Sequence, residues 1–153
     1  MPMSEQAQIE VTVGESSWAA DGVMFPNPHA VAFVDDLADA GSLLHAPLVS
    51  PQQSFPDGVN VEFVVVRGDD HAEFRVFERG VGETRSCGTG AVAVAWAFRQ
   101  RQGANNSGAP VVVDVRGGRL HAYERSDGHW VLAGPTEVVA EGVIDVQWWK
   151  DNE

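Results

Sequence analysis

Cysteine is almost absent from this chain, whose 153 residues include a single one, Cys87. A single cysteine cannot form an internal disulfide bond, which excludes a disulfide-stapled fold and indicates a reducing, cytoplasmic setting. We expect no secretion signal, because the first residues, MPMSEQ, show no basic stretch followed by an apolar one. The sequence also has no internal repeat and no low-complexity tract.

Basic residues are scarce relative to acidic ones. The chain has 10 Lys and Arg residues against 22 Asp and Glu residues, a formal net charge of −12 at pH 7. This charge argues against a nucleic acid or an anionic membrane as a partner. The apolar run at residues 91–98 is far too short to span a bilayer. An apolar fraction of 44% nevertheless supports a core, and we expect residues 1–153 to form a single domain.

Residues 78–98 are the segment that most strongly indicates a reactive site, with the sequence ERGVGETRSCGTGAVAVAWAF. The segment after Cys87 alternates small and large residues, as a strand can, but four alanines in eight positions favour a helix. We therefore predict a helix from about Gly90 to about Gln102, ended by Gly103. Its first two turns are apolar on every side, which indicates a helix surrounded by protein.

Cys87, Gly88 and Thr89 lie at the predicted amino-terminal end of that helix. Free backbone N–H groups and the positive end of the helix dipole meet there. A thiol at this position is expected to have a lowered pKa, and so more thiolate character near neutral pH. The amides of residues 88–90 also form a cradle for an anion such as a carboxylate. The loop thus predicts a base beside a binding site for an acid group.

Other interpretations of this loop remain open. A lone cysteine is more often a small buried apolar residue than a reactive group. The pattern Gly88-x-Gly90-x-x-Ala93 formally fits a dinucleotide-binding fingerprint, but Ser86 and Cys87 do not end an apolar strand, and no acidic residue lies between Gly90 and Val113 to bind a ribose. A phosphatase-like anion loop needs an arginine six residues after the cysteine, where this chain has Ala93.

Polar candidates also occur in residues 26–29, Pro-Asn-Pro-His. The two prolines stiffen the backbone and hold Asn27 extended. Taken alone, Asn27 and His29 are more simply explained as loop punctuation than as site residues.

Three further candidates belong to a predicted hairpin. Asn60 lies near the start of the strongest predicted strand, residues 59–66, where it must be either a structural tie or a ligand contact. Glu78 and Arg79 end the next strand. They are either an exposed pair or, because Gly80 follows at once, part of a shaped site.

Short alternating segments predict the rest of the fold. Residues 16–22 are expected to form a turn, 35–44 a short helix, and the proline-marked segment from 47 to 58 a long surface loop. Together the elements predict an α+β fold in which a curved, mostly antiparallel β-sheet or barrel wraps around a central apolar helix. We expect strands at residues 9–13, 23–25, 59–66, 72–78, 111–115, 119–124, 130–133 and 138–146.

Three motifs agree in order and spacing: PNPHAV at residues 26–31, DGVNVEF at 57–63, and ERGVGETRSCGTG at 78–90. Together they resemble diaminopimelate epimerase, a cofactor-independent enzyme that interconverts LL- and meso-diaminopimelate in lysine and peptidoglycan synthesis. The likeness runs from about Ile9 to about Ile144. Pro26 departs from the family motif, which commonly has glycine there.

The resemblance implies two similar domains that hold the substrate between them, each contributing one catalytic cysteine. This chain matches the second domain only, with Cys87 as its cysteine and with Glu78 and His29 assisting the thiols. No cofactor and no metal are implied. Glu78 is also among the matches to substrate-binding residues. The others are Asn27, Asn60 and Arg79 for the distal amino-acid end, and Gly88 and Thr89 for the reacting carboxylate.

A missing first half has a mechanistic consequence. Inverting a carbon centre without a cofactor requires acid/base groups on both of its faces. We therefore expect the chain to be inactive or nearly so alone, to need the amino-terminal domain of the same enzyme as partner, and to be capable of forming a homodimer through its uncovered face. The alternatives are a proline racemase-like or phenazine-pathway isomerase of the same fold, or a non-catalytic binding or assembly module.

Overall fold

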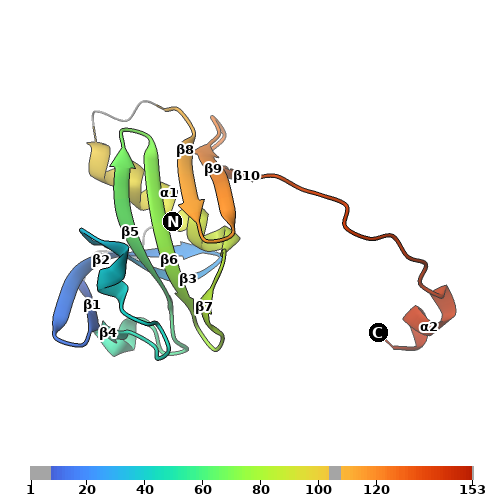
Figure 1. Cartoon of the computed structure of the whole chain (residues 1–153), viewed down its shortest axis with the longest axis horizontal. Helices are drawn as coiled ribbons and strands as arrows, with labels where there is room; N and C mark the ends of the chain where they lie inside the picture. The colour runs from blue at the N-terminus through green and yellow to red at the C-terminus, as the bar shows by residue number, and fades with distance from the viewer. Residues whose placement is uncertain (1–7, 104–107, 153) are drawn as a thin grey trace.

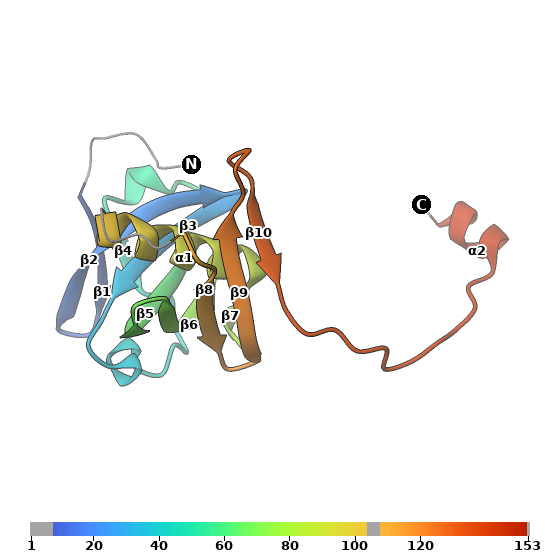
Figure 2. The same ribbon diagram turned by 90° about the horizontal axis from the view of Figure 1, so that it is seen from above.

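A computed structural model describes residues 8–103 and 108–152. It contains a ten-stranded mixed sheet that curls around one long helix, α1 (Gly88–Gln102) (Figures 1 and 2). The strands are β1 (Ile9–Val13), β2 (Ser16–Phe25), β3 (Asn27–Phe33), β4 (Leu48–Ser50), β5 (Asn60–Gly68), β6 (His71–Glu78), β7 (Gly82–Thr84), β8 (Val111–Val115), β9 (Gly118–Glu124) and β10 (Trp130–Ala133). The short helices are η1 (Leu37–Ala40), η2 (Gln52–Ser54) and α2 (Val146–Asp151).

The sheet is open, with the strand order β10-β9-β8-β6-β5-β3-β2-β1-β4 and with β7 paired to β6. Among the strands described, β3–β5 and β6–β8 pair in parallel and the other neighbours are antiparallel. The predicted α+β fold, a curved and mostly antiparallel sheet around an apolar helix, is therefore confirmed, in its open rather than its barrel form.

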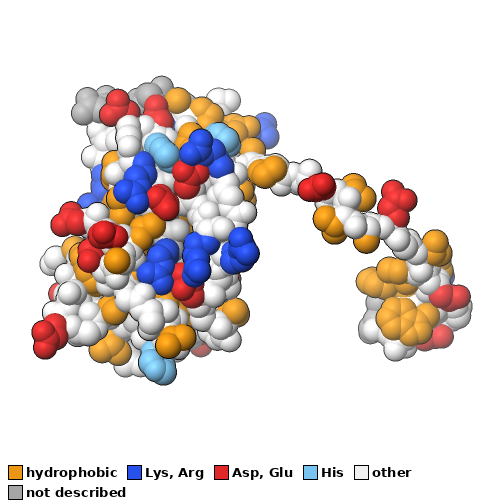
Figure 3. Space-filling view, in the orientation of Figure 1, with side chains coloured by type: hydrophobic (Ala, Val, Ile, Leu, Met, Phe, Trp, Pro, Cys, Tyr) orange, Lys and Arg blue, Asp and Glu red, His pale blue; other side chains and the backbone are white. Residues whose placement is uncertain are grey.

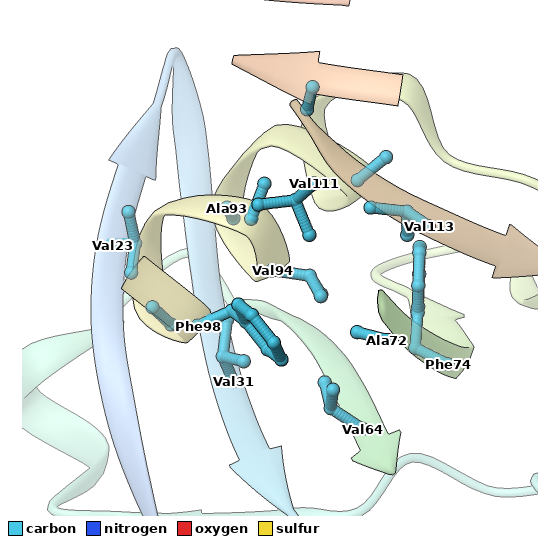
Figure 4. Close-up of a cluster of buried hydrophobic side chains, with 14 of the residues drawn as sticks. Val23, Val31, Val64, Ala72, Phe74, Ala93, Val94, Phe98, Val111 and Val113 are labelled. Carbon is cyan, nitrogen blue, oxygen red and sulfur yellow. The ribbon is translucent and has the colours of Figure 1, made fainter. Parts of the chain in front are cut away.

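Helix α1 forms the centre of the larger core. It starts at Gly88, two residues earlier than predicted, because Cys87 caps it with an extended backbone and a sulfur that accepts the Gly90 N–H. Its alanines let the strands approach on several sides at once. Figure 4 shows Ala93, Val94 and Phe98 among side chains of β2, β3, β5, β6 and β8. The labelled partners are Val23, Val31, Val64, Ala72, Phe74, Val111 and Val113.

Strand β5 is buried on both faces, which explains its nearly continuous apolar run. Val64 faces α1, as do the polar side chains of Asn60 and Glu62. The alternate residues Val61 and Phe63 belong to a second core beneath β1, β4 and η1. The strand thus places two polar side chains in buried positions next to the helix.

The predicted turn at residues 16–22 is wrong, because these residues form the first part of the ten-residue strand β2. The chain turns instead at Gly14, whose φ is +59°. Pairing with β1 on one side and β3 on the other overrides the weak strand propensity of this segment. Trp18 also packs edge-on against Phe63, with ring centroids 5.8 Å apart.

The strand predicted at residues 138–146 is also wrong. The sheet ends at β10, and the following chain runs away from it as an extended segment that leads to α2 (Figure 1). The alternation in this segment is real, but no strand of the described chain pairs with it. Apolar side chains are visible along it in Figure 3, and those more than half exposed are Val138, Val139, Val143, Ile144, Val146, Trp148 and Trp149.

Smaller differences concern the segment between β3 and β5. The helix predicted at residues 35–44 is the single-turn η1, and the predicted loop at 47–58 contains β4 and η2. The first six residues, on which the expectation about secretion rests, lie outside the described part of the chain. Within the described part, no helix combines the length and the apolar character needed to cross a membrane.

Candidate active site

The thiol of Cys87 lies at the amino-terminal end of α1 and is almost fully buried, at 7% exposure. Three groups approach the sulfur: the Gly90 N–H at 3.4 Å, the Thr89 hydroxyl at 3.4 Å and the Asn60 amide nitrogen at 3.9 Å. Each can donate to sulfur. The site can therefore stabilise a negative charge on the thiol once a proton has left it.

The expectation of a lowered pKa for Cys87 is wrong. Burial raises the pKa of the thiol above its ordinary value, and the negative charges of Glu78 and Glu62 raise it further. Hydrogen bonds from Thr89 and from the Gly90 amide oppose this change without cancelling it. The sequence showed the helix terminus, but neither the burial of the sulfur nor the two carboxylates near it.

The first turn of α1 retains two unused backbone donors. The Gly90 N–H donates to the Cys87 sulfur, and the Ala91 N–H donates to the Cys87 carbonyl. Among the described residues no acceptor is found for the N–H groups of Gly88 and Thr89. Because Gly88 is exposed, an anion can reach these amides beside the thiol, as predicted from the sequence.

Asn60 is a structural tie in this structure. Its side-chain oxygen accepts the Arg79 backbone N–H at 3.0 Å, and its nitrogen points to the Cys87 sulfur. With 2% of its surface exposed, both ends of the amide are used inside the protein. Asn60 thereby fixes the end of β6 against the thiol, and its direct contact with a substrate stays a prediction.

Glu78 is held at the end of β6 by a residue that the sequence analysis did not single out. The Thr84 hydroxyl donates to the Glu78 carboxylate at 2.5 Å, across the β6–β7 pair. Glu78 is half-buried and close enough to raise the pKa of Cys87. The motif that links Glu78 to Cys87 therefore builds a carboxylate next to the thiol.

Arg79 and Asn27 line one hollow of about 460 Å³ on the surface of the domain. The Arg79 guanidinium donates to the carbonyls of Asp57 at 3.1 Å and Gly58 at 3.3 Å, which directs it along the rim of this hollow. The remaining lining residues are Met24, Pro26, Pro28, Ser54, Phe55 and Pro56.

His29 lies behind this hollow, fully buried. Its Nδ1 is 2.6 Å from a carboxylate oxygen of Glu62, and its Nε2 is 3.2 Å from the side-chain oxygen of Asn27. Burial raises the pKa of Glu62, while the bond to His29 opposes that rise. The structure thus joins His29 to Asn27 and to Glu62, and no bond from His29 to Cys87 is found in the described chain.

Glu62 and Thr84 are the site residues that sequence reasoning missed. A signal for Glu62 existed: it is an acidic residue two positions after Asn60 in a valine-rich strand, so it shares the buried face of Asn60. Thr84 gave no comparable signal. No group of three or more His, Cys, Asp or Glu side chains suited to a metal ion occurs among the described residues.

A family model described as diaminopimelate epimerase matches residues 22–139. The chain belongs to the diaminopimelate epimerase family. The matched region includes all three motifs and every candidate residue from Asn27 to Thr89.

Curated relatives carry the same family name. The diaminopimelate epimerase of Streptomyces coelicolor is 54% identical over a region that covers 92% of this chain and 50% of that protein. The relative from Bacillus licheniformis is 37% identical, with 93% and 51% covered, and that from Leptospira biflexa is 40% identical, with 81% and 43% covered. This member of the diaminopimelate epimerase family thus spans about half the length of the curated relatives it matches.

A solved structure supports the fold. A PhzF-family phenazine biosynthesis protein from Bacillus anthracis superposes with a TM-score of 0.50 at 20% identity, over 81% of this chain and 39% of that protein. At this identity the likeness concerns the fold alone.

Proposed function

We propose that this chain supplies one half of a diaminopimelate epimerase site, with Cys87 as one of two catalytic thiols. The observation that carries the proposal is the arrangement around Cys87: a buried thiol with three donors directed at its sulfur, next to two unused backbone N–H groups. A proton-transfer group and an anion site lie side by side, as α-proton abstraction from an amino acid requires.

In the proposed reaction Cys87 exchanges a proton with one face of the α-carbon. Negative charge develops on the adjoining carboxylate as the proton leaves, and the N–H groups of Gly88 and Thr89 stabilise it. The raised pKa of Cys87 keeps the resting group in the thiol form, so a proton is present to be delivered. It also makes the thiolate, when formed, a stronger base toward a weakly acidic C–H bond.

The opposite face of the α-carbon needs a second proton-transfer group. In our proposal a cysteine of the other half of the enzyme provides it, since this chain has one cysteine. Asn27, Arg79 and the hollow that they line receive the distal amino-acid end of diaminopimelate. Glu78, His29 and Asn60 hold the thiol and the hollow in a fixed position relative to each other. No cofactor takes part.

A joined protein tests the proposal directly. This chain would be fused to the half of the Streptomyces coelicolor enzyme that it does not match, and the conversion of LL- to meso-diaminopimelate would be followed by chiral chromatography. We expect conversion by the joined protein and none by this chain alone. A joined protein that folds, shown by a cooperative thermal transition, yet converts nothing would favour a non-catalytic binding module.

A further inference from the structure

The carboxylate of Glu62 is the most deeply buried charged group near the site. Its side chain has no exposed surface, and one oxygen, Oε1, lies 2.6 Å from His29 Nδ1. The other oxygen, Oε2, has no hydrogen-bond partner among the described residues. A buried polar atom without a partner is unfavourable, so a carboxylate at this position calls for an explanation.

A series of contacts connects Glu62 to the hollow that Asn27 and Arg79 line. His29 joins Glu62 through Nδ1 and Asn27 through Nε2. Asn27 is half-buried and lines the hollow that it shares with Arg79. A buried acid is thus connected by one imidazole to an amide at the surface of the proposed substrate pocket.

The positions of the hydrogens decide which atoms of Glu62, His29 and Asn27 donate and which accept. The side-chain oxygen of Asn27 faces His29 Nε2, and an oxygen only accepts, so Nε2 must carry a hydrogen. Nδ1 then either carries a second hydrogen that it donates to ionised Glu62, or accepts one from protonated Glu62. In the first state Glu62 balances the charge of the doubly protonated ring, and in the second it supplies the hydrogen that Nδ1 accepts, so both states are compatible with a hydrogen on Nε2.

The same contact shows which end of the Asn27 amide is left for the hollow. Because the amide oxygen is used by His29, the amide nitrogen is the end left for a ligand in the hollow. Asn27 and Arg79 then both present donors there, which suits an acceptor such as a carboxylate. With a bare Nε2 the amide would turn over and present its oxygen instead.

The position of Glu62 is fixed by its surroundings on two sides. Parallel pairing of β3 and β5 places Glu62 next to the strand that carries His29. On the helix side it lies against Gly90, where an added Cβ would be 2.7 Å from Oε1. The carboxylate therefore has little freedom to turn away from the imidazole.

We propose that Glu62 is a positioning residue that holds His29 protonated at Nε2 and thereby orients the Asn27 amide as a hydrogen-bond donor toward the substrate pocket. The effect of Glu62 on catalysis rests on the proposed function. The presence of a proton on Nε2 does not rest on it, and this proton can be measured on this chain alone.

Nitrogen NMR of the imidazole rings tests the proposal. In the wild-type chain at neutral pH we expect His29, assigned by its loss in His29→Gln, to show the chemical shift of a protonated Nε2. Glu62→Gln can still donate to Nδ1, so it should keep this signature. Glu62→Met, of similar size but unable to donate or to balance charge, should lose it, giving mixed tautomers and shifted Asn27 side-chain resonances. Asn27→Ala should leave the Glu62–His29 pair, and the protonated Nε2, in place.

The wild-type spectrum tests the proposal even if the Glu62→Met variant fails to fold. A His29 protonated only at Nδ1 in the wild-type chain overturns the proposal, and so does an unchanged His29 spectrum in a folded Glu62→Met variant. In the joined protein we expect Glu62→Met to raise KM at least threefold while kcat changes less. If the wild-type joined protein is inactive but the NMR result holds, the proposed function fails and the role of Glu62 stands.

Discussion

The carboxylate of Glu62 and the backbone of Gly90 are in contact at the start of α1, so closely that a Cβ atom at position 90 would lie 2.7 Å from Oε1 and 3.3 Å from the Cys87 sulfur. Neither neighbour can move freely, because Oε1 is bonded to His29 and the sulfur caps the helix. Glycine is therefore required at this position by the site itself.

We predict that Gly90→Ala destabilises the domain by about 2 kcal/mol or more, through overpacking and loss of the Glu62–His29 bond. The measurement is urea unfolding followed by fluorescence. Gly142→Ala is the matched control, since nothing lies within 4 Å of an added Cβ there. Equal stabilities for the two variants would show that the contact at Gly90 relaxes without strain.

The raised pKa of Cys87 predicts slow thiol chemistry at neutral pH. Because the cysteine is single, its alkylation by iodoacetamide can be followed by mass spectrometry as a function of pH. We expect the rate to rise through a pKa above the ordinary thiol value, since burial and two carboxylates disfavour the thiolate.

Glu78→Gln should lower the pKa of Cys87, because it removes one of the negative charges near the sulfur. At fixed pH below that pKa we expect alkylation to be faster by roughly threefold. Glu137→Gln, a change of an exposed acid in the extended segment, is the control and should leave the rate unchanged. Slower alkylation in Glu78→Gln would contradict the electrostatic account.

The lowered pKa of Asp114 predicts how the stability of the domain changes in acid. Hydrogen bonds from Arg119, and then from His71, lower the pKa of its carboxyl from 3.8 to about 2. A group with a depressed folded pKa contributes stability above its unfolded pKa, and that stability is lost as the pH falls from 3.8 toward 2. Because the side chain is about one quarter exposed, we expect a contribution of about 1 kcal/mol rather than the full linkage value.

Asp114→Asn should therefore lower stability near neutral pH and flatten its acid dependence below pH 4. Chemical unfolding at several pH values measures both effects. A control is Asp127→Asn, in a more exposed ion pair between β9 and β10. The account fails at this point if Asp114→Asn keeps the full acid dependence of the wild type.

The extended segment after β10 offers a test of the corrected carboxy-terminal structure. Deletion of residues 136–153 should leave the Tm within about 2 °C of the wild type, because single surface changes rarely exceed that and these apolar side chains are exposed. A strand at residues 138–146 packed on the sheet would instead make the deletion strongly destabilising.

The sequence allowed the core of the fold to be predicted where periodicity was local. Strands such as β6 and β8 alternate clearly, and α1 followed from its alanines and from Gly103. The first part of β2, residues 16–22, was wrongly predicted as a turn because its two neighbouring strands, rather than its own residues, make it a strand. Residues 138–146 misled for the opposite reason: they alternate, but a strand also needs a partner.

The candidate site could be predicted in outline but not in its electrostatics. The position of Cys87 at a helix terminus was visible in the sequence, whereas its burial and its two acidic neighbours depend on strands far apart in the chain. Glu62 was missed because an acidic residue in a strand usually indicates a solvated face. Only the packing of β5 between two cores makes it a buried one.

The central claim is that Cys87 transfers the α-proton of diaminopimelate. Its most direct test is the incorporation of solvent deuterium at the α-carbon by the joined protein, measured by mass spectrometry for Cys87→Ala and, as the neighbouring control, Ser86→Ala. We predict that Cys87→Ala abolishes isomer interconversion and slows exchange at least about 100-fold for the isomer whose α-proton faces Cys87, while Ser86→Ala behaves as wild type. Exchange and interconversion at the wild-type rate in Cys87→Ala would contradict the account.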